Sequence, residues 1–294
     1  MISLTLLIPC PSYGYSVLTH EAIVDSAWET SIRPLLLKRF PGATQTDLLQ
    51  AHSYAYGGCI LQDMGYYPFG SHLFSDLTHY VRSGDFIQTL IRESQDLNEY
   101  AFALGALAHY AADNRGHPIA TNLAVPMLYP KLMQKFGKRV TYWDDHTSHI
   151  KTEFGFDVLQ VASGHYGSDH YRDFIGFRVA KPVLERAFLA TYGIELKDVV
   201  SNLNLALGSF RYSVSSVIPS MTVVAWKLKG AELQKETPSL TRDKFLYNLD
   251  SVNPGVERIL VSAKTGEGVD EWRAWLARMG AVPTGAGAGA EARV

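Results

Sequence analysis

The 294-residue chain is poor in cysteine, in net charge and in long apolar runs, and each shortage excludes a class of protein. Two cysteines, Cys10 and Cys59, exclude a disulfide-stapled scaffold and a metal site built from thiolates. A formal net charge of −2 gives no electrostatic reason for binding duplex nucleic acid or an anionic membrane. No apolar run reaches the roughly 20 residues that a transmembrane helix needs, so the sequence predicts no membrane span.

Strand signals are also scarce before about residue 255, whereas the helical period recurs along most of the chain. Thr19 and Ser83 are expected to cap helices, and Pro34 to kink the first one. Helices are expected at about 20–40, 46–61, 85–94, 98–113, 141–163, 169–192, 195–217 and 219–235. The sequence therefore predicts an all-α, multi-helix domain that ends near residue 236.

Histidine, by contrast, is concentrated, because eight of the ten histidines fall within one third of the chain, between His72 and His170. His109, Asp113 and His117 are spaced by four residues, and His149 and Glu153 repeat this spacing. Residues four apart lie about 40° apart around a helix, so each set faces one way. The helix around His109 is so apolar that burying an imidazole and a carboxylate there would be costly unless they were paired or metal-bound. Such groups, converging from neighbouring helices, predict a Zn²⁺ or multi-metal site.

Five pieces of sequence carry a family resemblance that runs from Tyr15 to about Ala225. In order, they are YSVLTHEAI, GGCILQDMGYYPFGSH, FSDLTHY, HYAADNRGHP and HTSHIKTEF. This part of the chain resembles the zinc-dependent phospholipase C and S1/P1 nuclease superfamily. The resemblance implies an all-α bundle, export to the periplasm or the extracellular space, and up to three Zn²⁺ ions at the bottom of a cleft.

The resemblance also implies ligands for each metal. The first ion would be held by His79, His109 and Asp113, the second by His117, His149 and Glu153, and the third by His20, a bridging Asp113 and the mature amino terminus. That terminus would be Tyr15, five positions before His20, where the family usually has tryptophan. Residues 1–14 are accordingly expected to be a truncated signal peptide, although an ordinary buried N-terminal segment is the alternative.

Other polar residues receive supporting roles. Asp63 resembles the family's proposed base, which orients or deprotonates the attacking water. His72 competes with His79 for the first metal or lines the cleft, and His146 is either a neighbour of the ligands or a surface residue. Asp76, Asp144 and Asp145 are candidates for fixing histidine tautomers. The remaining histidines, His52, His165 and His170, are expected not to be ligands.

The implied activity is hydrolysis of a phosphodiester by a metal-activated water. The aromatic run from Met64 to Phe69 could form the apolar rim of a phospholipase or stack a base in a nuclease. The residues of the motifs resemble the phospholipase branch slightly more than the nuclease branch. The expected substrate is then a phospholipid or other phosphodiester, with transient contact with a membrane surface and no stable nucleic-acid partner. A nuclease and a catalytically silent metal-binding protein remain the alternatives.

The composition changes after Thr237-Pro238. Residues 245–279 predict a short strand, a turn and a helix, and they resemble the end of the G domain of a nickel-incorporation GTPase. No phosphate-binding loop and no base-reading Asn-Lys-x-Asp motif accompany this fragment, so GTP binding is not expected and a role in nickel delivery is the least favoured reading. Residues 280–294 are rich in glycine and alanine and are expected to be disordered.

Overall fold

The computed structural model describes residues 17–163, 176–236, 238 and 241–242. All of them lie in the first of the two units into which the chain divides, Met1–Val252 and Asn253–Val294. The signal peptide, Tyr15, His165, His170 and the C-terminal appendage and tail that the sequence predicts lie outside the described residues. None of the described helices is long and apolar enough to cross a membrane.

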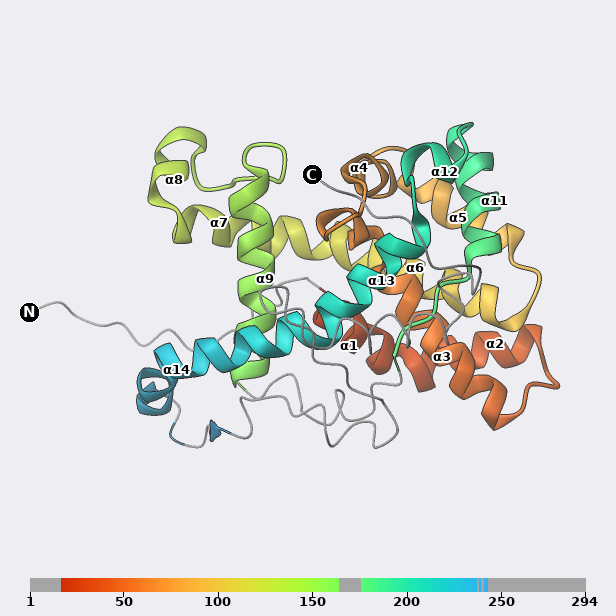
Figure 1. Cartoon of the computed structure of the whole chain (residues 1–294), viewed down its shortest axis with the longest axis horizontal. Coiled ribbons are helices and arrows are strands. Elements are labelled where there is room, and N and C mark those ends of the chain that lie inside the picture. The colour runs from red at the N-terminus through yellow and green to blue at the C-terminus, as the bar shows by residue number, and fades with distance from the viewer. Residues whose placement is uncertain (1–16, 164–175, 237, 239–240, 243–294) are drawn as a thin grey trace, which may run out of the picture. The chain divides into compact units, whose positions relative to one another are not determined.

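Every regular element of the described residues is a helix, which confirms the all-α prediction (Figure 1). The α-helices are α1 (Val17–Ala27), α2 (Arg33–Arg39), α3 (Gln45–Ile60), α4 (His72–Tyr80), α5 (Ser83–Glu93), α6 (Leu97–Gly116), α7 (Asn122–Leu128), α8 (Pro130–Phe136), α9 (His146–Ser163), α11 (Lys181–Tyr192), α12 (Leu196–Val199), α13 (Leu203–Tyr212) and α14 (Ile218–Glu236). Single π or 3₁₀ turns are η1 (Trp28–Ile32), η2 (Leu61–Tyr66), η3 (His117–Thr121) and η4 (Ser213–Val217).

Several helix ends differ from the predicted ones for local reasons. The first helix is split by η1, and Pro34, which has no N–H to donate, lies in the first turn of α2. Helix α3 begins after Thr44 because Thr44 and Asp47 cap each other's backbone in a capping box. Helix α9 begins at His146, later than predicted, because the Asp145 carboxylate accepts a hydrogen bond from the Ser148 N–H at 2.8 Å.

Helices α3 and α6 form the most extensive contact between two elements. The two backbones come close together at glycine residues, which have no side chain to hold them apart. A Cβ atom added to Gly58 would lie 1.9 Å from the Phe102 carbonyl oxygen, and one added to Gly105 would lie 1.9 Å from the Ala55 carbonyl oxygen. Gly58 on α3 and Gly105 on α6 therefore let the two helices approach each other closely.

Buried aromatic side chains complete the core around this helix pair. The largest that are almost fully enclosed are Tyr56, Phe74, Phe86, Phe102, Phe188 and Phe210. They connect α3 and α6 with α4, α5, α11 and α13. Burying an aromatic or large aliphatic side chain of this kind contributes roughly 1.5–3 kcal/mol. This packing fixes the end of α3 beside the second half of α6, where the polar residues collect.

Candidate metal centre

Eight imidazole and carboxylate side chains from six elements converge in the described part of the chain. They are His20 of α1, Asp63 of η2, His79 of α4, His109 and Asp113 of α6, His117 of η3, and His149 and Glu153 of α9. Their ligand atoms form three groups, in each of which all atoms lie within 4.8 Å of one another. All eight are residues that the sequence singled out as ligands or as the base.

Asp113 lies at the centre of this cluster. Its Oδ1 is 3.4 Å from His20 Nε2 and 3.5 Å from His117 Nε2. Its Oδ2 is 3.0 Å from His109 Nε2 and 3.5 Å from His79 Nε2. One carboxylate thus faces four imidazoles, as a bridging metal ligand would.

Two further carboxylates extend the cluster to either side. Glu153 Oε1 lies 3.0 Å from His117 Nε2 and 3.2 Å from His149 Nδ1. Asp63 Oδ1 lies 3.3 Å from His79 Nε2. Asp63 is therefore within reach of the same position as His79 and His109, so its carboxylate could be a ligand as well as a base.

The hydrogen bonds of two histidines fix which ring nitrogen faces the centre. His109 Nδ1 donates to the Cys59 carbonyl oxygen and His79 Nδ1 donates to that of Ser75, each at 2.7 Å. When both rings are neutral, each Nε2 carries a lone pair, and the two atoms face each other across 3.0 Å. Two nitrogens bound to one tetrahedral Zn²⁺ would lie about 3.3 Å apart. A cation between them would turn this repulsive contact into a favourable one.

At the α9 end of the cluster, a hydrogen bond likewise fixes which histidine nitrogen faces the other ligands. His149 Nε2 donates to the Asn122 side-chain oxygen at 2.9 Å, which turns its Nδ1 lone pair toward Glu153 Oε1. When the neighbouring imidazoles are neutral and turn their lone pairs inward, His149 Nδ1, Glu153 Oε1 and Asp113 Oδ1, all buried, have no hydrogen-bond donor. Buried acceptors without a donor are costly. Zn²⁺ ligation by nitrogen and oxygen would satisfy all three, so the donor set fits this metal.

The charges of the cluster compensate one another. Burial lowers the pKa of His109 and of His117, but the Asp113 carboxylate and its neighbours outweigh this effect and raise each pKa to about 9. Burial also raises the pKa of Asp113, but the imidazoles around it hold this pKa well below its ordinary value. Burial and the nearby His109 lower the pKa of His20 to about 4. Protons or metal ions are therefore needed here as counter-charges.

The metal-free protein is expected to lose stability as the pH rises from about 6.5 to about 9. A histidine whose pKa is raised in the folded state stabilises it fully below the unfolded pKa, and loses that effect as the pH passes the folded pKa. His109 and His117 both follow this rule, whereas His20 changes charge only below 6.5. Thermal unfolding in chelator should show a falling midpoint, and added Zn²⁺ should flatten it. A midpoint in chelator that does not fall over this range would contradict the coupling.

A cavity of about 260 Å³ opens over the cluster. It is lined by His79, His109, Asp113 and His117 of the cluster and by the aromatic side chains of Tyr80, Tyr110, Tyr142 and Trp143. The Tyr80 and Tyr142 rings stack at 5.3 Å, and Trp143 is exposed beside them.

The aromatic wall differs from the one that the sequence suggested. In the run from Met64 to Phe69, Met64 is buried in the core and Phe69 is exposed, and only the Tyr66 ring, 6.0 Å from that of His79, lies near the cluster. Sequence reasoning missed Tyr142 and Trp143, although the pair stands only a few residues before His149.

The residues proposed for supporting roles make other contacts. Asp76 accepts from the Tyr142 hydroxyl at 3.4 Å, Asp144 accepts from Thr141, and Asp145 caps α9. Two backbone carbonyls and the Asn122 amide orient the cluster histidines instead. His72 is exposed with its ring 6.0 Å from that of Tyr66, and His146 is exposed with its ring 4.2 Å from that of Tyr142.

Asn122→Ala is expected to weaken zinc binding at the His117–His149–Glu153 position by roughly 10–100-fold, because a hydrogen-bond partner that orients a ligand is lost. Asn122→Asp should restore most of the affinity, since a carboxylate also accepts from His149 Nε2. Competition with a chromophoric chelator measures the effect. Asn114→Ala is the matched control, because the Asn114 amide donates to the Tyr110 carbonyl of its own helix. Equal affinity in wild type and Asn122→Ala would contradict the orienting role.

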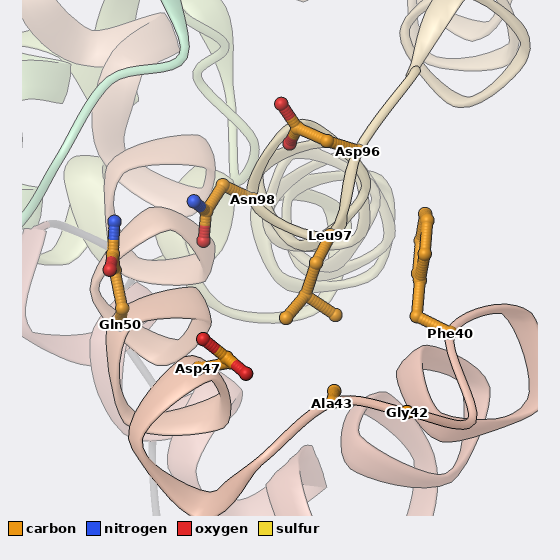
Figure 2. A pocket seen from close by; sticks show the side chains of 8 residues that line it. All are labelled: Phe40, Gly42, Ala43, Asp47, Gln50, Asp96, Leu97 and Asn98. Atoms are coloured by element: carbon orange, nitrogen blue, oxygen red, sulfur yellow. The ribbon is translucent and has the colours of Figure 1, made fainter.

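A larger hollow, of about 470 Å³, lies at the start of α6 (Figure 2). It is lined by Phe40, Gly42, Ala43, Asp47, Gln50, Asp96, Leu97 and Asn98. Its two carboxylates cap α3 and α6, and it contains no imidazole. Leu97, in this hollow, and Asp113, in the cluster, are sixteen positions apart on α6, which is about 24 Å along the helix. The smaller cavity is therefore the candidate functional site.

Comparison with known proteins agrees with this geometry. The sequence pattern of the family described as zinc dependent phospholipase C matches residues 19–202, which is more than half of the chain and includes all eight cluster residues. No curated protein and no solved structure gives a significant match. The family is zinc-dependent, and the described residues contain three groups that could hold a metal ion. This chain belongs to the zinc-dependent phospholipase C family.

Proposed function

We propose that this protein hydrolyses the phosphodiester bond of a phospholipid and releases a phosphorylated head group. The observation that carries the proposal is the convergence of four imidazoles on the Asp113 carboxylate, which lines a cavity. Family membership supplies the reaction type.

The eight cluster residues, together with the amino terminus of Tyr15, would hold the metal ions. One position would use Asp63, His79, His109 and Asp113, a second would use His117, His149 and Glu153, and a third would use His20 and Asp113 with the Tyr15 amino terminus that cleavage would expose. Zn²⁺ bound there would supply Lewis acidity, which lowers the pKa of a water and offsets the charge of the phosphate.

Asp63 is the residue best suited to receive a proton. Burial raises its pKa, but His109 and His79 outweigh this effect and lower the pKa below its ordinary value. Its carboxylate is therefore anionic at neutral pH. Held 3.3 Å from His79 Nε2 and grouped with His79 and His109, it could orient a water beside these residues and accept its proton.

The lining of the cavity favours a phospholipid over a nucleic-acid strand. Among the described residues that line it there is no lysine or arginine, whereas proteins that bind a polyanionic strand place such side chains along it. The stacked Tyr80 and Tyr142 rings with Trp143 offer aromatic faces to a cationic head group. The same rings could stack a base, which keeps a nuclease as the second candidate.

The experiment compares two substrates with the zinc-loaded full chain. Short-chain phosphatidylcholine below its critical micelle concentration should be hydrolysed, a single-stranded oligonucleotide should be cut far more slowly, and a chelator should abolish both activities until Zn²⁺ is returned. Preferential cutting of the oligonucleotide would favour the nuclease. Zinc binding without turnover on either substrate would refute the hydrolase and leave a silent metal-binding protein.

A further inference from the structure

Residues 123–139 form a helical hairpin at the mouth of the cavity. It consists of most of α7, all of α8 and the turn that follows, and its two helices contact each other (Figure 1). The Val140 N–H donates to the Asn122 carbonyl at 2.9 Å and so closes the base of the hairpin. Asn122 before the hairpin and Thr141 to Trp143 after it line the cavity. The hairpin therefore starts and ends on the rim of the candidate site.

The hairpin exposes large apolar side chains. Met127 is 73% exposed and Leu128 is 60% exposed, and Met133 on α8 is exposed as well. Helix α8 buries none of its residues. Ile119 and Trp143, just outside the base, extend the apolar surface toward the cavity. A gathering of exposed apolar side chains on a short protruding element is characteristic of an interaction surface.

The same hairpin is basic. Lys131, Lys135, Lys138 and Arg139 are all exposed, and residues 123–139 contain no aspartate or glutamate. The whole chain carries a net charge of −2, so the positive charge here is local. Basic side chains beside exposed apolar ones are the composition of segments that lie in the interface of an anionic membrane.

We propose that the 123–139 hairpin docks the protein onto the surface of an anionic phospholipid bilayer. This inference rests on the proposed function, which places the substrate in such a surface. Met127, Leu128 and Met133 would enter the boundary between head groups and acyl chains, while the basic side chains face lipid phosphates. Docking in this way brings the cavity rim to the lipid.

Two other occupants fit less well. Nucleic acid would use the basic side chains but would leave the exposed methionines and leucine without a partner. A second copy of the chain would bring four positive charges against four like charges across a two-fold interface. An anionic lipid surface satisfies both the apolar and the basic side chains.

The test measures how the zinc-loaded full chain partitions onto vesicles of phosphatidylcholine with about one third phosphatidylglycerol. A charge variant combines Lys131→Gln, Lys135→Gln and Lys138→Gln, and an apolar variant combines Met127→Ser and Leu128→Ser. The matched controls are Lys38→Gln/Lys197→Gln/Lys227→Gln and Leu49→Ser/Leu228→Ser, which change exposed residues outside the hairpin. Trp143 is left intact because it lines the cavity.

The charge variant should bind these vesicles on the order of 100-fold more weakly, since each basic residue near an anionic surface contributes about fivefold. The apolar variant should lose about tenfold or more, with little dependence on salt. Both should melt like wild type and hydrolyse monodisperse short-chain phosphatidylcholine at the wild-type rate. The controls should bind like wild type.

Vesicle binding that is equal in wild type and both hairpin variants would overturn the docking proposal, even if hydrolysis of monodisperse lipid is intact. Variant-sensitive binding to a single-stranded oligonucleotide without binding to vesicles would also overturn it, in favour of nucleic acid. Hairpin-dependent vesicle binding without hydrolysis of any lipid would support the docking surface and refute the proposed function.

Discussion

Asp113→Asn should lower kcat/KM for phosphodiester hydrolysis by at least about 1000-fold and remove at least one zinc ion from each chain. The carboxylate is the group that His20, His79, His109 and His117 share, at 3.0–3.5 Å. An asparagine of the same shape has no charge to offset four imidazoles, and its NH₂ group would point donor hydrogens at them. Steady-state kinetics and elemental analysis measure both effects.

Asp25→Asn is the matched control for that experiment. Asp25 is also a part-buried carboxylate that accepts from an imidazole, His52 at 2.9 Å, and from the Tyr56 hydroxyl, but it stands outside the cluster. Its variant should keep its zinc and its turnover even if its melting temperature falls. Wild-type zinc content and turnover in Asp113→Asn would show that Asp113 does not bridge metals.

Gly58→Ala is the second change with a large expected effect. The added Cβ would lie 1.9 Å from the Phe102 carbonyl oxygen and 2.9 Å from the Ala106 nitrogen. Both are backbone atoms that cannot rotate away, so α3 and α6 must separate. We expect a loss of about 3 kcal/mol or more in the free energy of unfolding. Zinc affinity should fall as well, because the neighbouring Cys59 carbonyl holds His109 Nδ1 at 2.7 Å.

Denaturant unfolding and zinc competition measure these two losses. Gly208→Ala provides the matched comparison, since Gly208 is an interior residue of α13 and an added Cβ would meet nothing within 4 Å. That variant should gain about 0.5–1 kcal/mol, the ordinary benefit of alanine over glycine in a helix. Gly58→Ala protein as stable as wild type would mean that α3 and α6 are not held in close contact.

The helices themselves could be predicted from the sequence because their periodicity is a local property. Their exact ends could not, since caps such as that of Thr44 with Asp47 compete with neighbouring candidates such as Thr46. The need for glycine at positions 57 and 58 could not be predicted either. It depends on backbone atoms that are distant in sequence, those of Arg178 for Gly57 and those of Phe102 and Ala106 for Gly58.

The candidate site, too, could be predicted from the sequence only in part. Four-residue spacing indicated that His109 and Asp113 share a face, as do His149 and Glu153. That α4 brings His79 to them followed from the family resemblance and not from spacing. The acceptors of the histidine N–H groups had no sequence signal, because Cys59 and Ser75 act through backbone carbonyls.

Predictions for the two ends of the chain stay predictions. Cleavage after Gly14, export, and a metal ligand at Tyr15 concern residues outside the described part. The same is true of the GTPase-like piece at 245–279 and of the tail at 280–294. N-terminal mass spectrometry of the purified protein would decide whether Tyr15 is the mature amino terminus.

The central claim is that the cluster around Asp113 is a multinuclear zinc site. Its most direct test is to add Zn²⁺ to the metal-free full-length protein, remove the excess by dialysis, and count the bound metal by elemental analysis. Two or three zinc ions per chain are expected, in keeping with the three groups of ligand atoms, and fewer in Asp113→Asn. Retention of no zinc, or of a single ion per chain, would contradict it.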